Sequence, residues 1–181
     1  PVLIIAAGQA DGTFVFRESL DDAGGPQTTG AGVGDFNGDG REDIVRVSGE
    51  VAWLHEQQAD GSWQARSLGA IENNVERALI VAVEVTDLDN DGDSDLAMCD
   101  SGRDLWVGAQ QPNGSFVYNI IGVCRQDTVG ITNSMAVMDV NDDGYPDIIG
   151  NSDSAFRNNT NQTLFARVYL GGLTGYSRSI H

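Results

Sequence analysis

The chain has 181 residues, enough for one domain with a sizeable core or for part of a larger one. Its 27 acidic residues outnumber its 10 basic ones, and the formal net charge is -17. This balance disfavours nucleic acid and anionic membranes as partners, because both bind basic patches. No apolar run approaches the ~20 residues of a membrane-spanning helix, which argues against membrane insertion.

The chain opens on a predicted hairpin, residues 3–20, whose turn is ADGTF at 10–14. Asp-Gly and Asn-Gly are preferred two-residue turns between antiparallel strands. The same signature returns as ADGSW at 59–63 and PNGSF at 112–116, and a degraded copy, TNQTLF, stands at 160–165. The chain is therefore predicted to contain four hairpins of one kind.

Three acidic segments alternate with these hairpins. DFNGDGRED at 35–43, DLDNDGDSD at 87–95 and DVNDDGYPD at 139–147 all fit D-x-[DN]-x-D-G-x-x-D, and their first residues are 52 positions apart. Asp, Asn and Gly are also ordinary turn formers. Three copies at one period favour a shared function over three unrelated turns.

Oxygen side chains at alternate positions, followed by a glycine, suit a loop that wraps a hard cation. Ca²⁺ takes about six to eight oxygens at ~2.3–2.6 Å, whereas Mg²⁺ prefers a rigid octahedron with retained waters. We therefore predict three Ca²⁺ sites. The side-chain ligands are Asp35, Asn37, Asp39 and Asp43; Asp87, Asp89, Asp91 and Asp95; and Asp139, Asn141, Asp143 and Asp147, with backbone carbonyls from Arg41, Asp93 and Tyr145.

These loops are not EF-hands, which need a bidentate Glu at position twelve and a helix on each side. Position twelve is occupied here by Arg46, Met98 and Gly150. The flanking segments are short and rich in Val, Ile and Leu, as in GVGDF before the first loop and DIVRV after it. Each loop is therefore predicted to join two antiparallel strands.

Combining the two signatures gives a unit of four strands and about 50 residues, the size of a β-propeller blade. Its third strand carries a tryptophan in VAWLH at 51–55 and DLWVG at 104–108. We predict an all-β propeller segment over 1–181, with a half blade at 1–22 and blades at 30–70, 79–122 and 134–172. The last unit departs from the pattern after Ser152, because SDSAFRNNTNQ lacks both the tryptophan and the turn glycine.

The acidic segments with a trailing DG[ST][FW] hairpin resemble the FG-GAP or VCBS repeats, best known from the propeller of integrin α chains. The resemblance covers nearly the whole chain. It implies blades that hold calcium between their first and second strands, in rings that are usually seven-bladed and belong to secreted or surface-exposed proteins. The expected localisation is therefore extracellular or at the cell surface.

Counting strands predicts an open assembly. The half blade has a third and a fourth strand, LFARVYLGG at 164–172 is expected to be the last outer strand, and LTGYSRSIH at 173–181 is expected to be a connector. Closed propellers need about four to eight blades, so the expected partners are further blades of a longer chain or neighbouring copies. The predicted core residues are Val33, Val85 and Val137, with Phe36, Leu88, Val140, Ile44, Leu96 and Ile148.

The leading functional hypothesis is a non-catalytic, calcium-stabilised segment used in adhesion, recognition or surface assembly. A second hypothesis is carbohydrate binding, with sugars stacked on Trp53, Trp63 or Trp106. A third is an accessory propeller of a polysaccharide-degrading enzyme. Catalysis by this chain is not expected, because its two histidines, His55 and His181, fit neither a catalytic triad nor a zinc spacing.

Two further sets of residues leave alternatives open. Cys99 and Cys124 could form a disulfide in an oxidising compartment, or remain two buried thiols. Asn113, Asn158 and Asn161 begin N-glycosylation sequons at predicted turns, which would be used in a secreted eukaryotic protein.

Overall fold

The computed structural model describes residues 3–20, 28–71, 79–102, 104–124, 135–153, 164–172 and 177–179. Over these ranges the chain forms strands and turns and no helix, which confirms the predicted all-β class. Accordingly, these ranges hold no helix long and apolar enough to cross a membrane.

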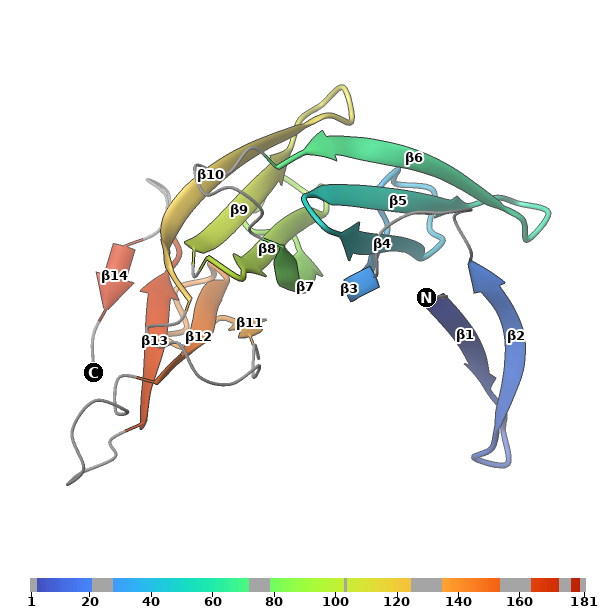
Figure 1. The fold of residues 1–181 in the computed structure, drawn as a ribbon, viewed down its shortest axis with the longest axis horizontal. Coiled ribbons are helices and arrows are strands. Elements are labelled where there is room, and N and C mark those ends of the chain that lie inside the picture. Colours follow the sequence, from blue (N-terminus) through green and yellow to red (C-terminus); the bar gives the residue numbers. More distant parts are fainter. Residues whose placement is uncertain are drawn as a thin grey trace.

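The strands of these described ranges form four antiparallel sheets, each following chain order. A two-stranded N-terminal sheet precedes three four-stranded blades (Figure 1). The N-terminal sheet contains β1 (Leu3–Gly8) and β2 (Phe14–Leu20), and the first blade β3 (Thr28–Gly34), β4 (Asp43–Ser48), β5 (Val51–Gln57) and β6 (Trp63–Ala70). The second blade contains β7 (Ile80–Thr86), β8 (Asp95–Asp100), β9 (Asp104–Gln110) and β10 (Phe116–Val123). The third contains β11 (Met135–Met138), β12 (Asp147–Asp153), β13 (Leu164–Leu170) and β14 (Ser177–Ser179).

The sheets lie side by side along an arc (Figure 1). The first strands β3, β7 and β11 lie on its concave side, and the outer strands β6 and β10 lie on its convex side. The N-terminal sheet and the third blade occupy opposite ends of this arc. This arrangement is that of propeller blades, as the four-stranded repeat predicted.

The Asp-Gly and Asn-Gly hairpins form as predicted at three positions. In each, the residue before the turn exchanges backbone hydrogen bonds across it: Gln9 with Thr13 and Gly12, Gln58 with Ser62 and Gly61, and Gln111 with Ser115 and Gly114. The turn glycines have φ between 75° and 84°, a left-handed conformation in which glycine carries no Cβ penalty. The turn chemistry therefore sets the register of the two outer strands.

The first and second blades pack through small residues on β3 and a branched residue on β7. A Cβ atom on Gly32 or Gly34 would lie 2.5 or 2.6 Å from a methyl carbon of Val85 on the next blade. One apolar cluster therefore fills the space between the first and second blades, and another fills the space between the second and third. The N-terminal sheet is tied to the first blade where the Trp63 indole N–H donates to Glu18 at 2.7 Å.

The core prediction is confirmed at most positions and wrong at two. Phe36, Leu88, Ile44, Leu96 and Ile148 are buried. Val85 and Val137 pack as partly buried members of the two clusters.

Val33 and Val140, by contrast, are 56% and 44% exposed. Val33 occupies the position of Val85, but the sheet before it contains, among the residues that the structure describes, only β1 and β2 and no inner strand to receive its side chain. Val140 occupies the position of Leu88, which packs towards a following blade, and no described sheet follows the third blade. Their exposure therefore follows from the missing neighbours.

The expected strand order of the third blade is also wrong. Leu164–Leu170, expected to be the outer strand, pairs with β12 and so occupies the third position as β13. The fourth position belongs to β14, Ser177–Ser179, which lies within the segment expected to be a connector. The degraded hairpin TNQTLF misled the prediction, and its residues 160–163 lie outside the described ranges.

Cys99 and Cys124 are joined by a disulfide, with their Cα atoms 6.0 Å apart. Cys99 lies near the end of β8, whereas Cys124 directly follows β10, the outer strand of the same blade. The bond therefore joins the start of the connector after β10 to the interior of the blade.

Candidate cation-binding loops

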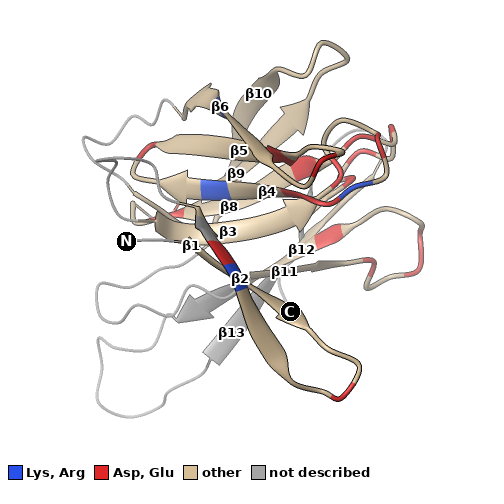
Figure 2. Cartoon of the chain, turned by 90° about the vertical axis from the view of Figure 1, so that its right-hand side faces the viewer, with Lys and Arg blue, Asp and Glu red and all other residues tan. Residues whose placement is uncertain are grey.

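The three acidic loops occupy the same place in each blade, between its first and second strands. Figure 2 shows many of the acidic residues at these turns, on one side of the blades. Because this placement repeats with the sequence period, the corresponding side chains can be compared one by one.

All three loops are wrapped in the same way around their first aspartate. Its Oδ2 accepts the N–H of the sixth-position glycine: Asp35 from Gly40 at 2.8 Å, Asp87 from Gly92 at 2.9 Å and Asp139 from Gly144 at 2.8 Å. The fifth-position Oδ1 accepts the N–H two residues on, at 2.9 Å in every loop. The motif therefore encodes one backbone shape that turns its carboxylates inward.

The ninth-position aspartates Asp43, Asp95 and Asp147 are buried and anchor the loop to the blade. Each Oδ2 accepts the N–H of the loop's second residue, at 3.2, 2.9 and 2.9 Å respectively. Each Oδ1 accepts an N–H at the end of the third strand, at 2.8 Å, from Gln57, Gln110 and Gly171. Gly171 directly follows β13, which independently places β13 third in its blade.

Several of these carboxyl groups sit in surroundings that disfavour a bare negative charge. Burial raises the pKa of Asp95 to about 6 and also raises the pKa of Asp43. Burial, and then the charge of Asp91, raises the pKa of Asp89. The pKa of Asp35 is instead lowered, chiefly by the N–H of Gly40. A cation among these groups would favour their ionised forms.

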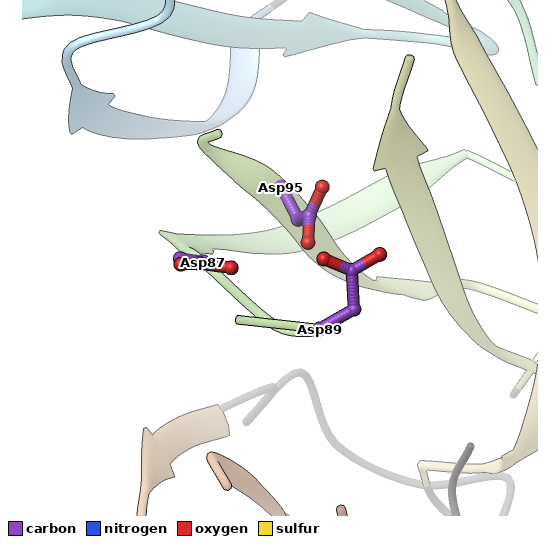
Figure 3. A group of neighbouring side chains, drawn as sticks. All are labelled: Asp87, Asp89 and Asp95. Atoms are coloured by element: carbon purple, nitrogen blue, oxygen red, sulfur yellow. The ribbon is translucent and has the colours of Figure 1, made fainter. Parts of the chain in front are cut away.

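The second loop brings three of its four predicted carboxylates together. One oxygen each from Asp87, Asp89 and Asp95 lies within 4.8 Å of the others (Figure 3). Oxygens that surround one Ca²⁺ at ~2.3–2.6 Å lie within about 5 Å of each other, so this donor set fits the ion. In the described part of the chain no other group of three acidic, His or Cys side chains meets this spacing.

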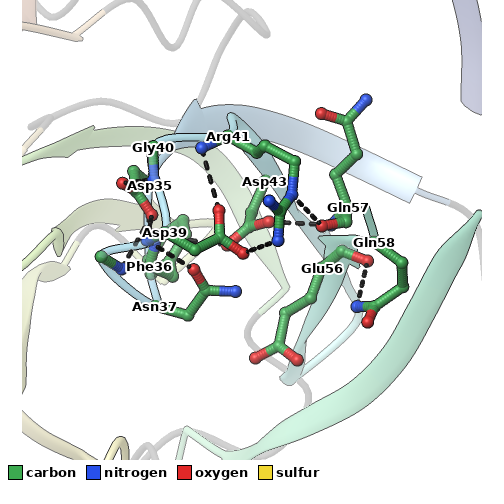
Figure 4. A network of polar contacts seen from close by, with 11 residues as sticks. Asp35, Phe36, Asn37, Asp39, Gly40, Arg41, Asp43, Glu56, Gln57 and Gln58 are labelled. Carbon is green, nitrogen blue, oxygen red and sulfur yellow. Dashed lines mark hydrogen bonds and ion pairs between the residues drawn. The ribbon is translucent and has the colours of Figure 1, made fainter. Parts of the chain in front are cut away.

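The first loop differs from the second because a positively charged side chain already contacts one of its predicted ligands. The guanidinium of Arg41 pairs with Asp39, and its Nε donates to the Gln57 carbonyl at 2.9 Å (Figure 4). From the sequence, only the backbone carbonyl of Arg41 was predicted to take part in the site. The missed signal was an opposite charge two residues after Asp39.

The third loop carries an amide at the position where the second carries Asp89. Asn141 Nδ2 donates to Asp143 Oδ2 at 2.9 Å, while Asn141 Oδ1 accepts the N–H of Asp143 at 3.1 Å. Asn37 occupies the same position in the first loop. These two loops therefore offer three carboxylates and one amide each, whereas the second offers four carboxylates.

A pocket of about 270 Å³ lies between the first and second blades, beside the first two loops. Its lining includes Arg66, Asp93, Gln110 and residues 36–38. Gln110 is 6% exposed; its Nε2 donates to the Phe36 carbonyl at 3.0 Å, and its Oε1 has no hydrogen-bond partner among the described residues. Sequence reasoning missed this pocket because it is built from segments far apart in the chain.

The tryptophans proposed for sugar stacking are largely used by the fold. Trp106 is buried, and its indole N–H donates to Asp100 at 3.0 Å. Trp63 is tied to Glu18, and Trp53 is half-buried on β5. His55 is also buried and accepts a hydrogen bond from Arg46 Nε at 3.1 Å, a structural contact.

Blades with a hydrogen-bonded acidic loop between their first two strands define the chain as a β-propeller-type repeat module. Two overlapping stretches, residues 35–98 and 87–150, match the FG-GAP-like repeat, and together they span more than half of the chain. Each match runs from the first aspartate of one loop to three residues past the end of the next. The chain belongs to the FG-GAP-like repeat family. Among curated protein sequences, none matches it.

Proposed function

We propose that the chain is a calcium-stabilised propeller segment of an extracellular or surface protein, acting in adhesion, recognition or surface assembly without a catalytic role. The observation that carries this proposal is the shared hydrogen-bonded shape of the three loops, with acidic side chains at the same positions in each. Membership of the FG-GAP-like repeat family supports the same interpretation.

Calcium in each loop would stabilise the blade by joining its first and second strands. Without the ion, the carboxylates of the second loop repel one another at close range. An ion that binds only the folded loop adds about 2.7 kcal/mol at a free concentration of ~100 times its Kd. For a chain of this size that corresponds to roughly 5–10 °C in Tm.

Differential scanning calorimetry tests this proposal directly. The chain, stripped with EGTA, should melt at a lower temperature than with excess Ca²⁺, and re-addition of Ca²⁺ should restore the transition. Mg²⁺ is the matched control and should restore less. A transition that neither EGTA nor Ca²⁺ moves would overturn the calcium proposal.

Carbohydrate binding is the second candidate, favoured by the pocket between the first and second blades rather than by the tryptophans. Its lining brings together the side chains of Arg66, Asp93 and Gln110, which supply a guanidinium, a carboxylate and an amide. A sugar hydroxyl can both donate and accept hydrogen bonds, and so suits such a mixed lining. Titration calorimetry against a monosaccharide panel is the test. Binding that Arg66→Ala abolishes would support it, and the absence of heat with every sugar would count against it.

We further propose an extracellular setting and further blades as partners. The disulfide between Cys99 and Cys124 supports an oxidising compartment. Asn113 is exposed at the tip of its hairpin, where a glycan would be tolerated, whereas Asn158 and Asn161 lie outside the described residues. Mass spectrometry of the natively expressed protein would test glycosylation at all three.

A further inference from the structure

Neighbouring acidic loops are joined directly by side-chain hydrogen bonds. Ser94 Oγ donates to the Asp35 carbonyl at 2.9 Å, joining the second loop to the first. Asn90 Nδ2 donates to the Gly144 carbonyl at 2.7 Å, joining the second loop to the third. Both donors belong to the second loop, which therefore contacts each of its neighbours.

Both donors stand between proposed metal ligands. Asn90 lies between Asp89 and Asp91, and Ser94 lies between Asp93 and Asp95. A cation in the second loop would therefore order the backbone on both sides of each donor.

Both acceptors also belong to ligand-bearing backbone. Asp35 is the first proposed ligand of its loop. The Gly144 carbonyl lies in the peptide group that leads into Tyr145, whose own carbonyl is a proposed ligand. The Tyr145 N–H of that same peptide donates to Asp143 Oδ1 at 2.9 Å, another proposed ligand. Fixing these acceptors would therefore restrict ligands of the neighbouring loops.

The backbone at Asn90 makes its side chain separable from the loop shape. Asn90 has φ 63°, and the equivalent residues, Gly38 and Asp142, have φ 71° and 59°. The left-handed conformation therefore belongs to this loop position. Glycine adopts it without penalty, so Asn90→Gly removes the amide donor and leaves a residue that suits the backbone.

We propose that Asn90 and Ser94 are positioning residues that couple cation binding at the second loop to binding at the first and third. An ion in the second loop holds both donors in place, so less conformational entropy remains to be lost when a neighbouring loop binds. The three sites then fill with positive cooperativity, and by linkage the neighbours strengthen the second site equally. This inference rests on the proposed calcium function.

Isothermal titration of the full chain with Ca²⁺ tests the coupling. The wild type should bind three ions with a Hill coefficient above 1. Neutralising the second loop with Asp87→Asn and Asp89→Asn should weaken the remaining two sites by roughly five-fold, the lower end of typical coupling. In an Asn90→Gly/Ser94→Ala background the same neutralisation should leave the remaining sites unchanged.

Asp142→Gly is the matched control, because it changes the equivalent position of the third loop, and within the described part of the chain Asp142 makes no hydrogen bond to another loop. It should leave the Hill coefficient at the wild-type value. Three independent sites in the wild type would overturn the coupling and leave the calcium proposal standing. A loss of cooperativity in Asp142→Gly as large as that in Asn90→Gly/Ser94→Ala would do the same. No heat of Ca²⁺ binding in any variant would overturn both.

Discussion

At the scale of single residues, the three acidic loops share a motif but differ in what surrounds their carboxylates. The second loop gathers Asp87, Asp89 and Asp95 around one point. In the first loop, Arg41 already pairs with Asp39. A guanidinium at this position competes with a metal ion for the same oxygens, so we expect the first loop to bind Ca²⁺ more weakly than the second.

Arg41→Gln should therefore strengthen Ca²⁺ binding at the first loop. The pair is partly exposed and worth at most about 1 kcal/mol, so the gain should be roughly two- to five-fold in Kd. Titration calorimetry on a chain whose second and third loops are neutralised isolates this site. Arg66→Gln, the same change of charge at a residue paired with Glu56, is the control and should have a smaller effect. Equal effects of the two variants would contradict this prediction.

Glycine should be required at position 92 because of the backbone conformation there, and not because a larger side chain would clash with its neighbours. Gly92 has φ 96°, and nothing lies within 4 Å of a Cβ built there. Gly92→Val should therefore cost at least about 1–2 kcal/mol, the penalty of a left-handed conformation for a residue with a Cβ. Thermal melts with and without Ca²⁺ measure the cost. Gly92→Asn should lose less, because asparagine tolerates this region, and equal losses would argue for a different cause.

At the scale of elements, one blade is stabilised by the next. Gly32 and Gly34 on β3 leave the space that Val85 of β7 fills. Val33, between the two glycines, points to the other face of the sheet, since side chains alternate along a strand. Positions 52 residues apart thus share a place in the repeat and differ in burial according to which neighbour is present.

This difference in burial predicts that the same substitution costs much more stability at Val85 than at the equivalent Val33. Val85→Asp should lower the free energy of unfolding by several kcal/mol, since it places a carboxylate against the apolar cluster between blades. Val33→Asp should stay within about 0.5–1 kcal/mol, because that side chain is exposed. Urea denaturation of both variants is the measurement. Similar losses would show that Val33 is covered in solution.

At the scale of the whole molecule, the arc of sheets has apolar side chains exposed at both ends. Ile4, Phe14 and Phe16 are exposed on the N-terminal sheet, and Met138 and Val140 are exposed on the third blade. Within the described ranges, β1 also pairs on one edge only, with β2. Exposed apolar faces and unpaired strand edges favour association with other strands.

Residues 1–181 alone should therefore associate rather than remain monomeric. Multi-angle light scattering in Ca²⁺ should give a mass that rises with protein concentration. Ile4→Ser with Phe16→Ser should reduce this association, whereas Val117→Ser, at a residue that is also exposed but lies on the outer strand β10, should not. A monodisperse wild-type monomer at all concentrations would refute the prediction.

The fold and the loop positions could be predicted from the sequence because their determinants are local. Asp-Gly and Asn-Gly turns set hairpin register, and the acidic motif sets its own backbone shape through hydrogen bonds within nine residues. The third blade was assigned the wrong strand order where this local chemistry is absent. The degraded turn signature TNQTLF suggested the fourth position for Leu164–Leu170, and only its pairing with β12 places this strand third.

The all-β class, the repeat of four strands and the places of the three acidic loops follow from local sequence patterns. Which equivalent residues are buried depends instead on the packing of the blades, because burial at Val33, Val85 and Val137 is set by the neighbouring sheet. This packing also decides the contacts between loops, such as Asn90 with Gly144, and the pocket containing Gln110. These join residues from different blades, and such proximity follows from how the blades pack rather than from any local pattern.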